Sequence, residues 1–127
     1  MEVAGQLKPV LLIEDNDETR EVVSALLELE GYRVVAARDG DEGMDHLRHG
    51  LDPCVILLDL MMPGRKNGLE FRQEQLKDPN LAAIPVIVCS GYEDVRRKAA
   101  GMGVTAFCQK PLEIEELLHL VAAHRRR

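Results

Sequence analysis

The chain has 127 residues, of which 46% are hydrophobic and 30% are charged, and its formal net charge is -6. This size and composition fit one globular domain with its own core. We therefore expect a single domain over residues 1–127, with a lead-in at 1–8 and a tail at 125–127. The excess of acidic over basic residues argues against direct nucleic-acid binding, because phosphate contacts need a basic face. No apolar run approaches a membrane span and the N-terminus lacks a signal-peptide pattern, so we expect a cytoplasmic protein without a membrane partner.

Short apolar runs alternate with helical patterns along the chain. The runs predict five strands, at residues 9–13, 32–37, 54–59, 85–90 and 104–109. The last helical pattern is the clearest, with apolar residues at i, i+3, i+4 and i+7: Ile114, Leu117, Leu118 and Val121. Five strands alternating with five helices predict an α/β fold, a doubly wound parallel sheet with helices on both faces. The pattern does not fix the strand order, but the order 2-1-3-4-5 would bring the ends of strands one and three together.

Local signals refine two of the expected helices. Asn16 or Asp17 is suited to cap the first turn of the first helix. In the helix after residue 68, Leu69 and Leu76 are expected on one face, with Phe71 close by.

Three cysteines, Cys54, Cys89 and Cys108, all fall inside strand-like runs. Their odd number and the lack of a CxxC spacing argue against a metal site or a disulfide framework. We expect reduced, buried thiols that act as small hydrophobic side chains.

Polar residues stand at the ends of four of the expected strands. Asp59 follows the apolar run at 55–58, and a carboxylate buried there must be paired, metal-bound or chemically used. The other strand-end polar residues are Glu14, Asp15, Ser90 and Lys110. Each acid alone could be a helix cap or turn former, but the whole set is hard to obtain from turn chemistry.

The chemistry of this set points to phosphoryl transfer. Two carboxylates about 5 Å apart repel by roughly 3 kcal/mol at an effective dielectric of about 20. Clustered acids therefore raise one another's pKa or hold a cation, and carboxylate oxygens suit Mg²⁺. Lys110 and Ser90 can contact phosphate oxygens, and Asp59 is a carboxylate nucleophile of the kind that forms an aspartyl phosphate.

Four motifs in combination, LLIEDND, VILLDLMMPG, PVIVCSG and FCQKPL, resemble those of the receiver domain of bacterial two-component response regulators. The resemblance covers essentially the whole chain. It implies a flavodoxin-like fold with strand order 2-1-3-4-5, as in the chemotaxis regulator. It also implies a phosphorylation-controlled signalling switch and not a metabolic enzyme.

The resemblance assigns roles at the acidic site. Asp59 would accept a phosphoryl group from a phosphohistidine of a sensor histidine kinase or a phosphotransfer protein. Asp15, Asp59 and the backbone carbonyl of Met61 would ligate Mg²⁺, or Mn²⁺ in its place, with Glu14 acting through water. Family members usually carry aspartate where this chain has Glu14, and the longer side chain would alter metal affinity slightly.

The resemblance also assigns the switch. Ser90 and Lys110 would contact the phosphoryl oxygens, and Ser90 and Phe107 would move on activation. The face formed by the fourth helix, the fifth strand and the fifth helix would then change for a downstream protein target. Met61 and Tyr92, two residues past the acceptor and past Ser90, would tune hydrolysis. Both are bulky and poorly suited to orient a water molecule, so we expect slow self-dephosphorylation.

Other interpretations of the sequence stay open. An aspartate-nucleophile phosphatase is disfavoured because such enzymes carry a second acid two residues after the nucleophile, where this chain has Met61. A receiver-like domain could bind a partner constitutively, without phosphorylation. The chain is too short for an output domain, so we expect a stand-alone receiver, with a receiver excised from a longer regulator or hybrid kinase as the alternative. The kinase, the target and the oligomeric state, including a phosphorylation-linked dimer, are not fixed by the sequence.

Overall fold

The computed structural model describes residues 8–59, 68–90, 101, 103–109 and 113–124. Five parallel strands form one sheet in the order β2-β1-β3-β4-β5, which confirms the expected doubly wound α/β fold. The strands are β1 (Val10–Ile13), β2 (Val34–Ala37), β3 (Val55–Asp59), β4 (Val86–Ser90) and β5 (Ala106–Gln109). The helices of the described part are α1 (Asp17–Leu29), α2 (Gly40–Arg48), α3 (Gly68–Lys77) and α5 (Ile114–Ala122). The helix expected between β4 and β5 lies outside the described residues.

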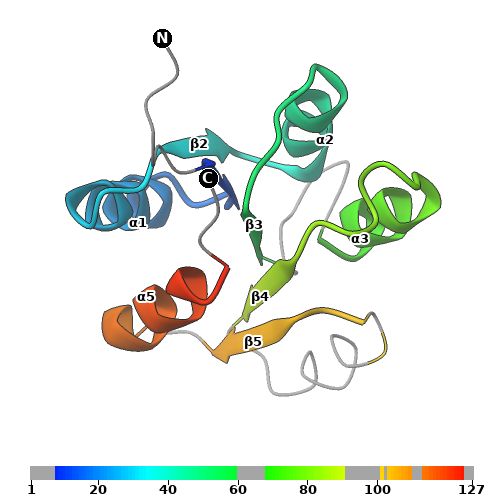
Figure 1. Cartoon of the computed structure of the whole chain (residues 1–127). Coiled ribbons are helices and arrows are strands. Elements are labelled where there is room, and N and C mark those ends of the chain that lie inside the picture. Colours follow the sequence, from blue (N-terminus) through cyan, green and yellow to red (C-terminus); the bar gives the residue numbers. More distant parts are fainter. Residues whose placement is uncertain (1–7, 60–67, 91–100, 102, 110–112, 125–127) are drawn as a thin grey trace, which may run out of the picture.

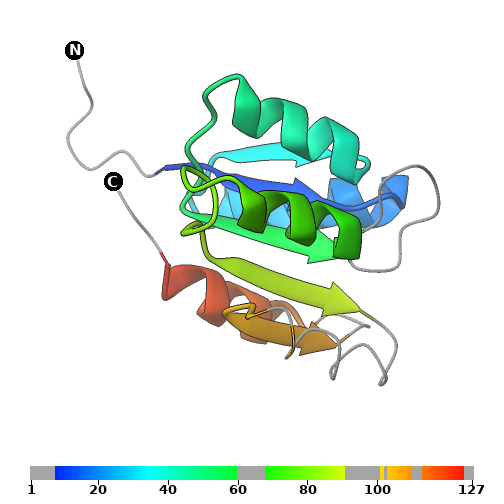
Figure 2. The ribbon, with the colours of Figure 1, turned by 90° about the vertical axis from the view of Figure 1, so that its right-hand side faces the viewer.

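Helices cover both faces of the sheet, α1 and α5 on one side and α2 and α3 on the other (Figures 1 and 2). Each face has its own apolar cluster. The cluster under α2 and α3 includes Leu11, Ile13, Met44, Leu58 and Phe71. The cluster under α1 and α5 includes Val10, Leu12, Leu27, Leu57 and Leu117. Successive residues of a strand point to opposite faces, so β1 and β3 supply both clusters, and this is why they are continuous apolar runs.

All five strands end at the residue expected from the sequence and begin one or two residues later. Tyr32, expected to open the second strand, is buried instead, and its backbone N–H donates to the Leu27 carbonyl at 3.1 Å. The first helix is capped by Asn16, whose side chain accepts a hydrogen bond from the Thr19 N–H at 2.8 Å.

Helix α3 presents a different face to the core from the one expected. Leu76 is 46% exposed, whereas Phe71 is fully buried, and the polar side chains of Arg72 and Gln75 are buried beside it. Leu69 is only partly buried and packs at the border of the cluster. The inward polar side chains make hydrogen bonds to each other and to nearby backbone carbonyls, which offsets the cost of burying them. A count of apolar residues cannot foresee this arrangement.

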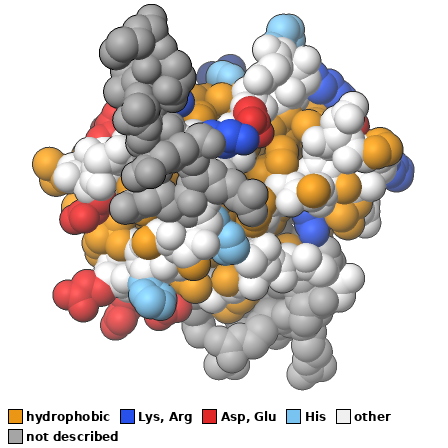
Figure 3. All heavy atoms as spheres, in the orientation of Figure 1, with side chains coloured by type: hydrophobic (Ala, Val, Ile, Leu, Met, Phe, Trp, Pro, Cys, Tyr) orange, Lys and Arg blue, Asp and Glu red, His pale blue; other side chains and the backbone are white. Residues whose placement is uncertain are grey.

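The surface of the described part carries both signs of charge. On the face seen in Figure 3, Lys and Arg side chains are scattered among hydrophobic and acidic ones, and acidic side chains gather near α5. The first turn of α5 contains Glu115 and Glu116.

Among the helices described, none has the length and apolar character needed to cross a membrane.

Candidate functional site

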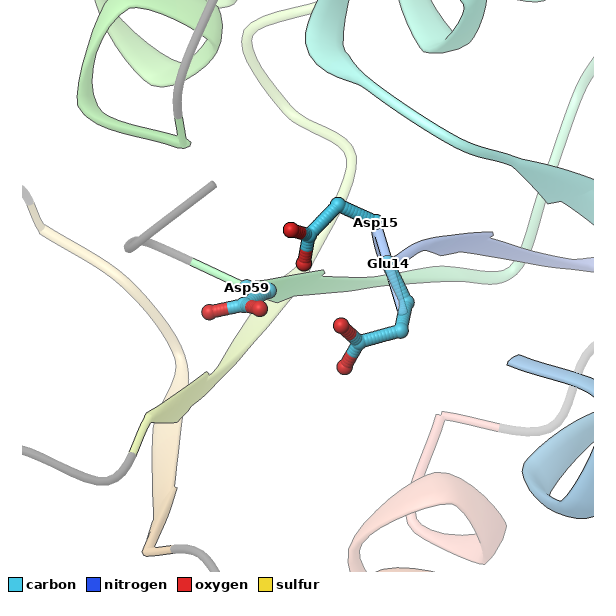
Figure 4. Close-up of side chains that lie close together, drawn as sticks. All are labelled: Glu14, Asp15 and Asp59. Atoms are coloured by element: carbon cyan, nitrogen blue, oxygen red, sulfur yellow. The ribbon is translucent and has the colours of Figure 1, made fainter. Parts of the chain in front are cut away.

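The parallel sheet places the ends of β1 and β3 side by side. Ile13, the last residue of β1, is the register partner of Leu58, so the residues that follow Ile13 lie next to Asp59. Glu14 and Asp15 follow β1 directly, and Asp59 is the last residue of β3. One carboxylate oxygen from each of these three acids lies within 4.8 Å of the others (Figure 4).

Two of the three acids are deeply buried. Glu14 is 3% exposed and Asp59 is 6% exposed, while Asp15 is intermediate. The Asn16 backbone N–H donates to the Glu14 carboxylate at 3.2 Å, so the start of α1 helps to position this side chain. Buried carboxylates held this close to one another are costly, and such an arrangement persists where it serves a cation or a reaction.

Arg20 fixes the turn that carries the acids. Its guanidinium donates to the backbone carbonyl of Glu14 at 2.9 Å and pairs with the Asp17 carboxylate. These contacts tie the first turn of α1 to the end of β1. The Arg20 guanidinium therefore fixes the backbone of Glu14, the first of the two acids that follow β1.

The three carboxylates fit a hard divalent cation. Oxygen donors from one or a few carboxylates are the ligands preferred by Mg²⁺, and Mn²⁺ accepts the same set. Beneath the acids lies a small cavity of about 10 Å³ whose lining includes Glu14, Asp59, Cys89, Leu57 and Leu117. Its walls are mostly apolar, which lowers the local dielectric and strengthens the field of the acids.

The remaining predicted site residues fall at neighbouring strand ends or outside the described residues. Ser90 ends β4, one residue past Cys89, which is the register partner of Asp59. Phe107 lies on β5, is partly buried, and packs against the cluster under α2 and α3. Lys110, Met61 and Tyr92 lie outside the described residues.

Cys89 lines the cavity beneath the acids, a position that the sequence did not predict. Within PVIVCSG it reads as one more small apolar residue of a buried strand. Its place beside Asp59 depends on the register of β3 against β4. The signal that could have found it is its position immediately before Ser90, a strand-end residue already singled out.

Residues 10–122 match the family model of the response regulator receiver domain. This chain belongs to the response regulator receiver family. Receiver domains are phosphoacceptor switches of two-component systems, so the family accounts for a cluster of acids at the carboxyl ends of the strands.

Relatives and solved structures of receiver domains agree with this assignment. The chain is 31% identical to the transcriptional regulatory protein CpxR of Escherichia coli K12 over 95% of this chain and 50% of that protein. It is 31% identical to protein PilH of Pseudomonas aeruginosa over 90% of this chain and 94% of that protein. Its fold matches the receiver domain of a signal transduction histidine kinase from Syntrophus aciditrophicus with a TM-score of 0.82 and 27% identity, over 92% and 89% of the two chains. The receiver domain described here thus spans about half the length of CpxR.

Proposed function

We propose that Asp59 is the phosphoacceptor of this receiver domain, and that its phosphorylation controls binding to a downstream protein. The observation that carries the proposal is the convergence of Glu14, Asp15 and Asp59 at one edge of the sheet. Asp59 ends a strand that is buried along its whole length, and it is the acid whose strand lies in the middle of the sheet, between β1 and β4. We infer that residues 1–127 form one receiver domain, because the sheet is complete within the matched range 10–122.

In this proposal the Asp59 carboxylate attacks the phosphorus of a phosphohistidine on a sensor histidine kinase or phosphotransfer protein. A new P–O bond forms to Asp59 as the P–N bond to the donor imidazole breaks. A divalent cation, when bound, neutralises charge on the phosphoryl oxygens. Asp15, Asp59 and the backbone carbonyl of Met61 would hold that cation directly, and Glu14 would hold it through water. The buried Glu14 carboxylate is kept in position by the Asn16 N–H.

Ser90 and Lys110 are proposed to contact the phosphoryl oxygens. The strand register supports this role, because Ser90 ends β4 and pairs with Gln109, which ends β5 and directly precedes Lys110 in the sequence. Phe107, partly buried on β5, is proposed to move inward when Ser90 shifts toward the phosphoryl group. The face that includes β5 and α5 would then differ between the two states. A free-energy difference of a few kcal/mol between the states is small enough for phosphorylation to shift their populations.

Labelling with acetyl phosphate tests the proposal, since this small donor needs no kinase. Wild-type protein is expected to incorporate the phosphoryl group only with Mg²⁺ or Mn²⁺ present, and Asp59→Asn is expected to lose incorporation. Asp45→Asn is the matched control, because Asp45 is an exposed acid on α2. Incorporation that persists in Asp59→Asn, or that proceeds equally well in EDTA, would contradict the proposal.

The lifetime of the phosphorylated form tests the proposed tuning residues. Because Met61 and Tyr92 are poorly suited to orient water, the aspartyl phosphate is expected to be lost slowly in the absence of a phosphatase. The measurement is the decay of labelled protein after removal of acetyl phosphate. Decay within seconds would refute the roles given to these two residues.

A further inference from the structure

Two buried thiols face each other next to the acidic site. Cys89 on β4 and Cys108 on β5 are register partners in the parallel sheet. Both belong to the apolar cluster under α1 and α5, so their side chains lie on the same face. Both are free thiols, and they hydrogen-bond to each other.

We propose that Cys89 and Cys108 are a peroxide-sensitive pair that closes to a reversible disulfide, and that closure slows phosphorylation of Asp59. The disulfide itself stands on the geometry of the sheet. Its effect on Asp59 rests in addition on the function proposed above.

The spacing of the strands suits such a bond. Neighbouring strands lie about 4.8 Å apart, within the range of about 4.4 to 6.8 Å that the Cα atoms of a disulfide span. The Cβ atoms of two residues in register on one face are also about 4.8 Å apart, so the two strands must approach by at least a few tenths of an ångström to reach the roughly 3.5 to 4.5 Å of a disulfide. The hydrogen bond from Cys89 also lowers the pKa of the Cys108 thiol, although burial and the carboxylate of Glu116 act in the opposite direction.

The third cysteine cannot take part. Cys54 lies in the same apolar cluster, but it precedes β3, five residues before Asp59, the register partner of Cys89. Five residues of extended chain span about 16 Å, far beyond the reach of a disulfide. Of the three cysteines in the chain, the structure brings together one pair.

Cys89 is the more accessible thiol of the pair. Cys89 lines the cavity beneath Glu14 and Asp59 and is 6% exposed, whereas Cys108 is 1% exposed. A small neutral oxidant such as hydrogen peroxide therefore meets Cys89 first. Its sulfur attacks one peroxide oxygen, an S–O bond forms as the O–O bond breaks, and the departing hydroxide leaves as water with the thiol proton.

Cys108 then completes the reaction. Its sulfur attacks the sulfenic sulfur of Cys89, an S–S bond forms as the S–O bond breaks, and the second hydroxide leaves as water with the Cys108 proton. In total two thiols are oxidised by two electrons, and one peroxide is reduced to two waters. A dithiol reductant reverses the bond by exchange.

The cross-link would tie together the two strand ends to which the phosphoryl contacts are assigned in the function proposed above. Cys89 immediately precedes Ser90, and Cys108 precedes Lys110 by two residues. A disulfide draws both cysteine side chains toward each other under the sheet and fixes the spacing of the two backbones. Because the phosphoryl contacts proposed for Ser90 and Lys110 depend on these two strand ends, the labelling of Asp59 is expected to slow.

Thiol counting tests the disulfide without any need for phosphorylation. Reduced protein is treated with hydrogen peroxide, quenched with catalase, unfolded and titrated for free thiols. The wild type is expected to fall from three thiols to one and to regain three with dithiothreitol, and peptide mapping is expected to show a link between Cys89 and Cys108. Cys54→Ala is expected to fall from two to none, while Cys89→Ala and Cys108→Ala form no intramolecular link. Retention of all three thiols, irreversible loss, or a link that includes Cys54 would overturn the proposal.

Labelling of the same samples tests the regulatory effect. The Cys54→Ala protein is the background of choice, because only the proposed pair remains. Its oxidised form is expected to label with acetyl phosphate several-fold more slowly than its reduced form, with recovery after dithiothreitol, and Cys108→Ala in this background should lose the response. Equal rates in the two forms would overturn the regulatory claim. If the reduced protein does not label at all, the proposed function and this regulatory claim fail together, and the thiol count still decides whether the pair forms.

Discussion

In the described part of the chain, the buried polar side chains belong to two groups that differ in the charges they bring together. The first is a network on α3. Arg72 donates to the side-chain amide oxygen of Gln75 at 2.7 Å and to the Gly103 backbone carbonyl at 3.1 Å. Gln75 in turn donates to the backbone carbonyls of Leu81 at 2.9 Å and Ile84 at 3.1 Å. Every one of these contacts joins a donor to an acceptor.

The second group is the acidic edge formed by Glu14, Asp15 and Asp59. Here three groups of the same kind face one another, with oxygens within 4.8 Å. Donors matched to acceptors stabilise one conformation, whereas like charges held together oppose it. Matched donors and acceptors, as on α3, stabilise the fold, whereas crowded acids, as at the acidic edge, are suited to bind a ligand. The α3 network holds the turn after α3 and the approach to β5, while the acidic edge offers the oxygen donors that suit a divalent cation.

Disrupting the α3 network is expected to give the largest loss of stability. Gln75→Leu removes the side-chain donor to the carbonyls of Leu81 and Ile84 and one acceptor of the buried Arg72 guanidinium, which costs about 2 to 4 kcal/mol of unfolding free energy. The measurement is urea unfolding. Gln73→Leu is the matched control on the exposed side of α3 and should stay within about 0.5 kcal/mol. Equal effects of the two substitutions would show that the network has no special role.

Removing one charge from the acidic edge is expected to raise the unfolding free energy. Asp59→Asn removes one of the crowded charges at nearly constant volume, so the unfolding free energy in metal-free buffer should rise by about 1 to 2 kcal/mol. The exposed Asp45→Asn should change little. A loss of more than about 1 kcal/mol in Asp59→Asn would mean that this charge stabilises the fold, and the contrast between the two groups would fail.

The Asn16 side chain is expected to stabilise the fold without contributing to the acidic site. Asn16→Ala removes the side-chain acceptor for the Thr19 N–H and should cost about 1 kcal/mol. Because the bond from residue 16 to the Glu14 carboxylate comes from the backbone N–H, Mg²⁺ affinity should be unchanged. Urea unfolding and calorimetric titration check the two halves. A large loss of Mg²⁺ affinity would make the Asn16 side chain part of the site.

The surface ion pair of Arg48 and Glu74 is expected to give the smallest loss of stability. It serves as a comparison for the buried guanidinium of Arg72. Arg48 lies 2.5 Å from the Glu74 carboxylate, but its side chain is 55% exposed. Solvent screens such a pair, so Arg48→Ala should cost less than about 1 kcal/mol, and the cost should shrink in high salt. A loss as large as that of Gln75→Leu in the same unfolding assay would show that burial does not govern these contributions.

The sequence predicted the acidic edge for a physical reason. A carboxylate directly after a buried apolar run, as at Asp59, marks a strand end, and parallel strands bring such ends to one edge. The strand order that joins Glu14 and Asp15 to Asp59 is not contained in the alternation of strands and helices, and it was supplied by the resemblance to receiver domains. The structure confirms that order.

Two features could not be predicted, because each depends on a relation between distant segments. The inward turn of Arg72 and Gln75 depends on carbonyls supplied by the turn after α3 and by Gly103, which an apolar pattern does not report. The pairing of Cys89 with Cys108 depends on the register of β4 against β5. The sequence shows two small residues in two strands, and only the folded sheet places them side by side.

If the proposed function is correct, the three acids from two strand ends act as one cation site that serves Asp59. Calorimetric titration of Mg²⁺ into the wild type, Glu14→Gln, Asp15→Asn and Asp59→Asn tests it most directly, with Asp45→Asn as the control. We expect one site in the wild type and in the control, and a Kd weakened about tenfold or more, or about 1.4 kcal/mol, in Asp15→Asn and Asp59→Asn, with a smaller loss in Glu14→Gln. Equal affinities across the series, or no binding to the wild type, would contradict it.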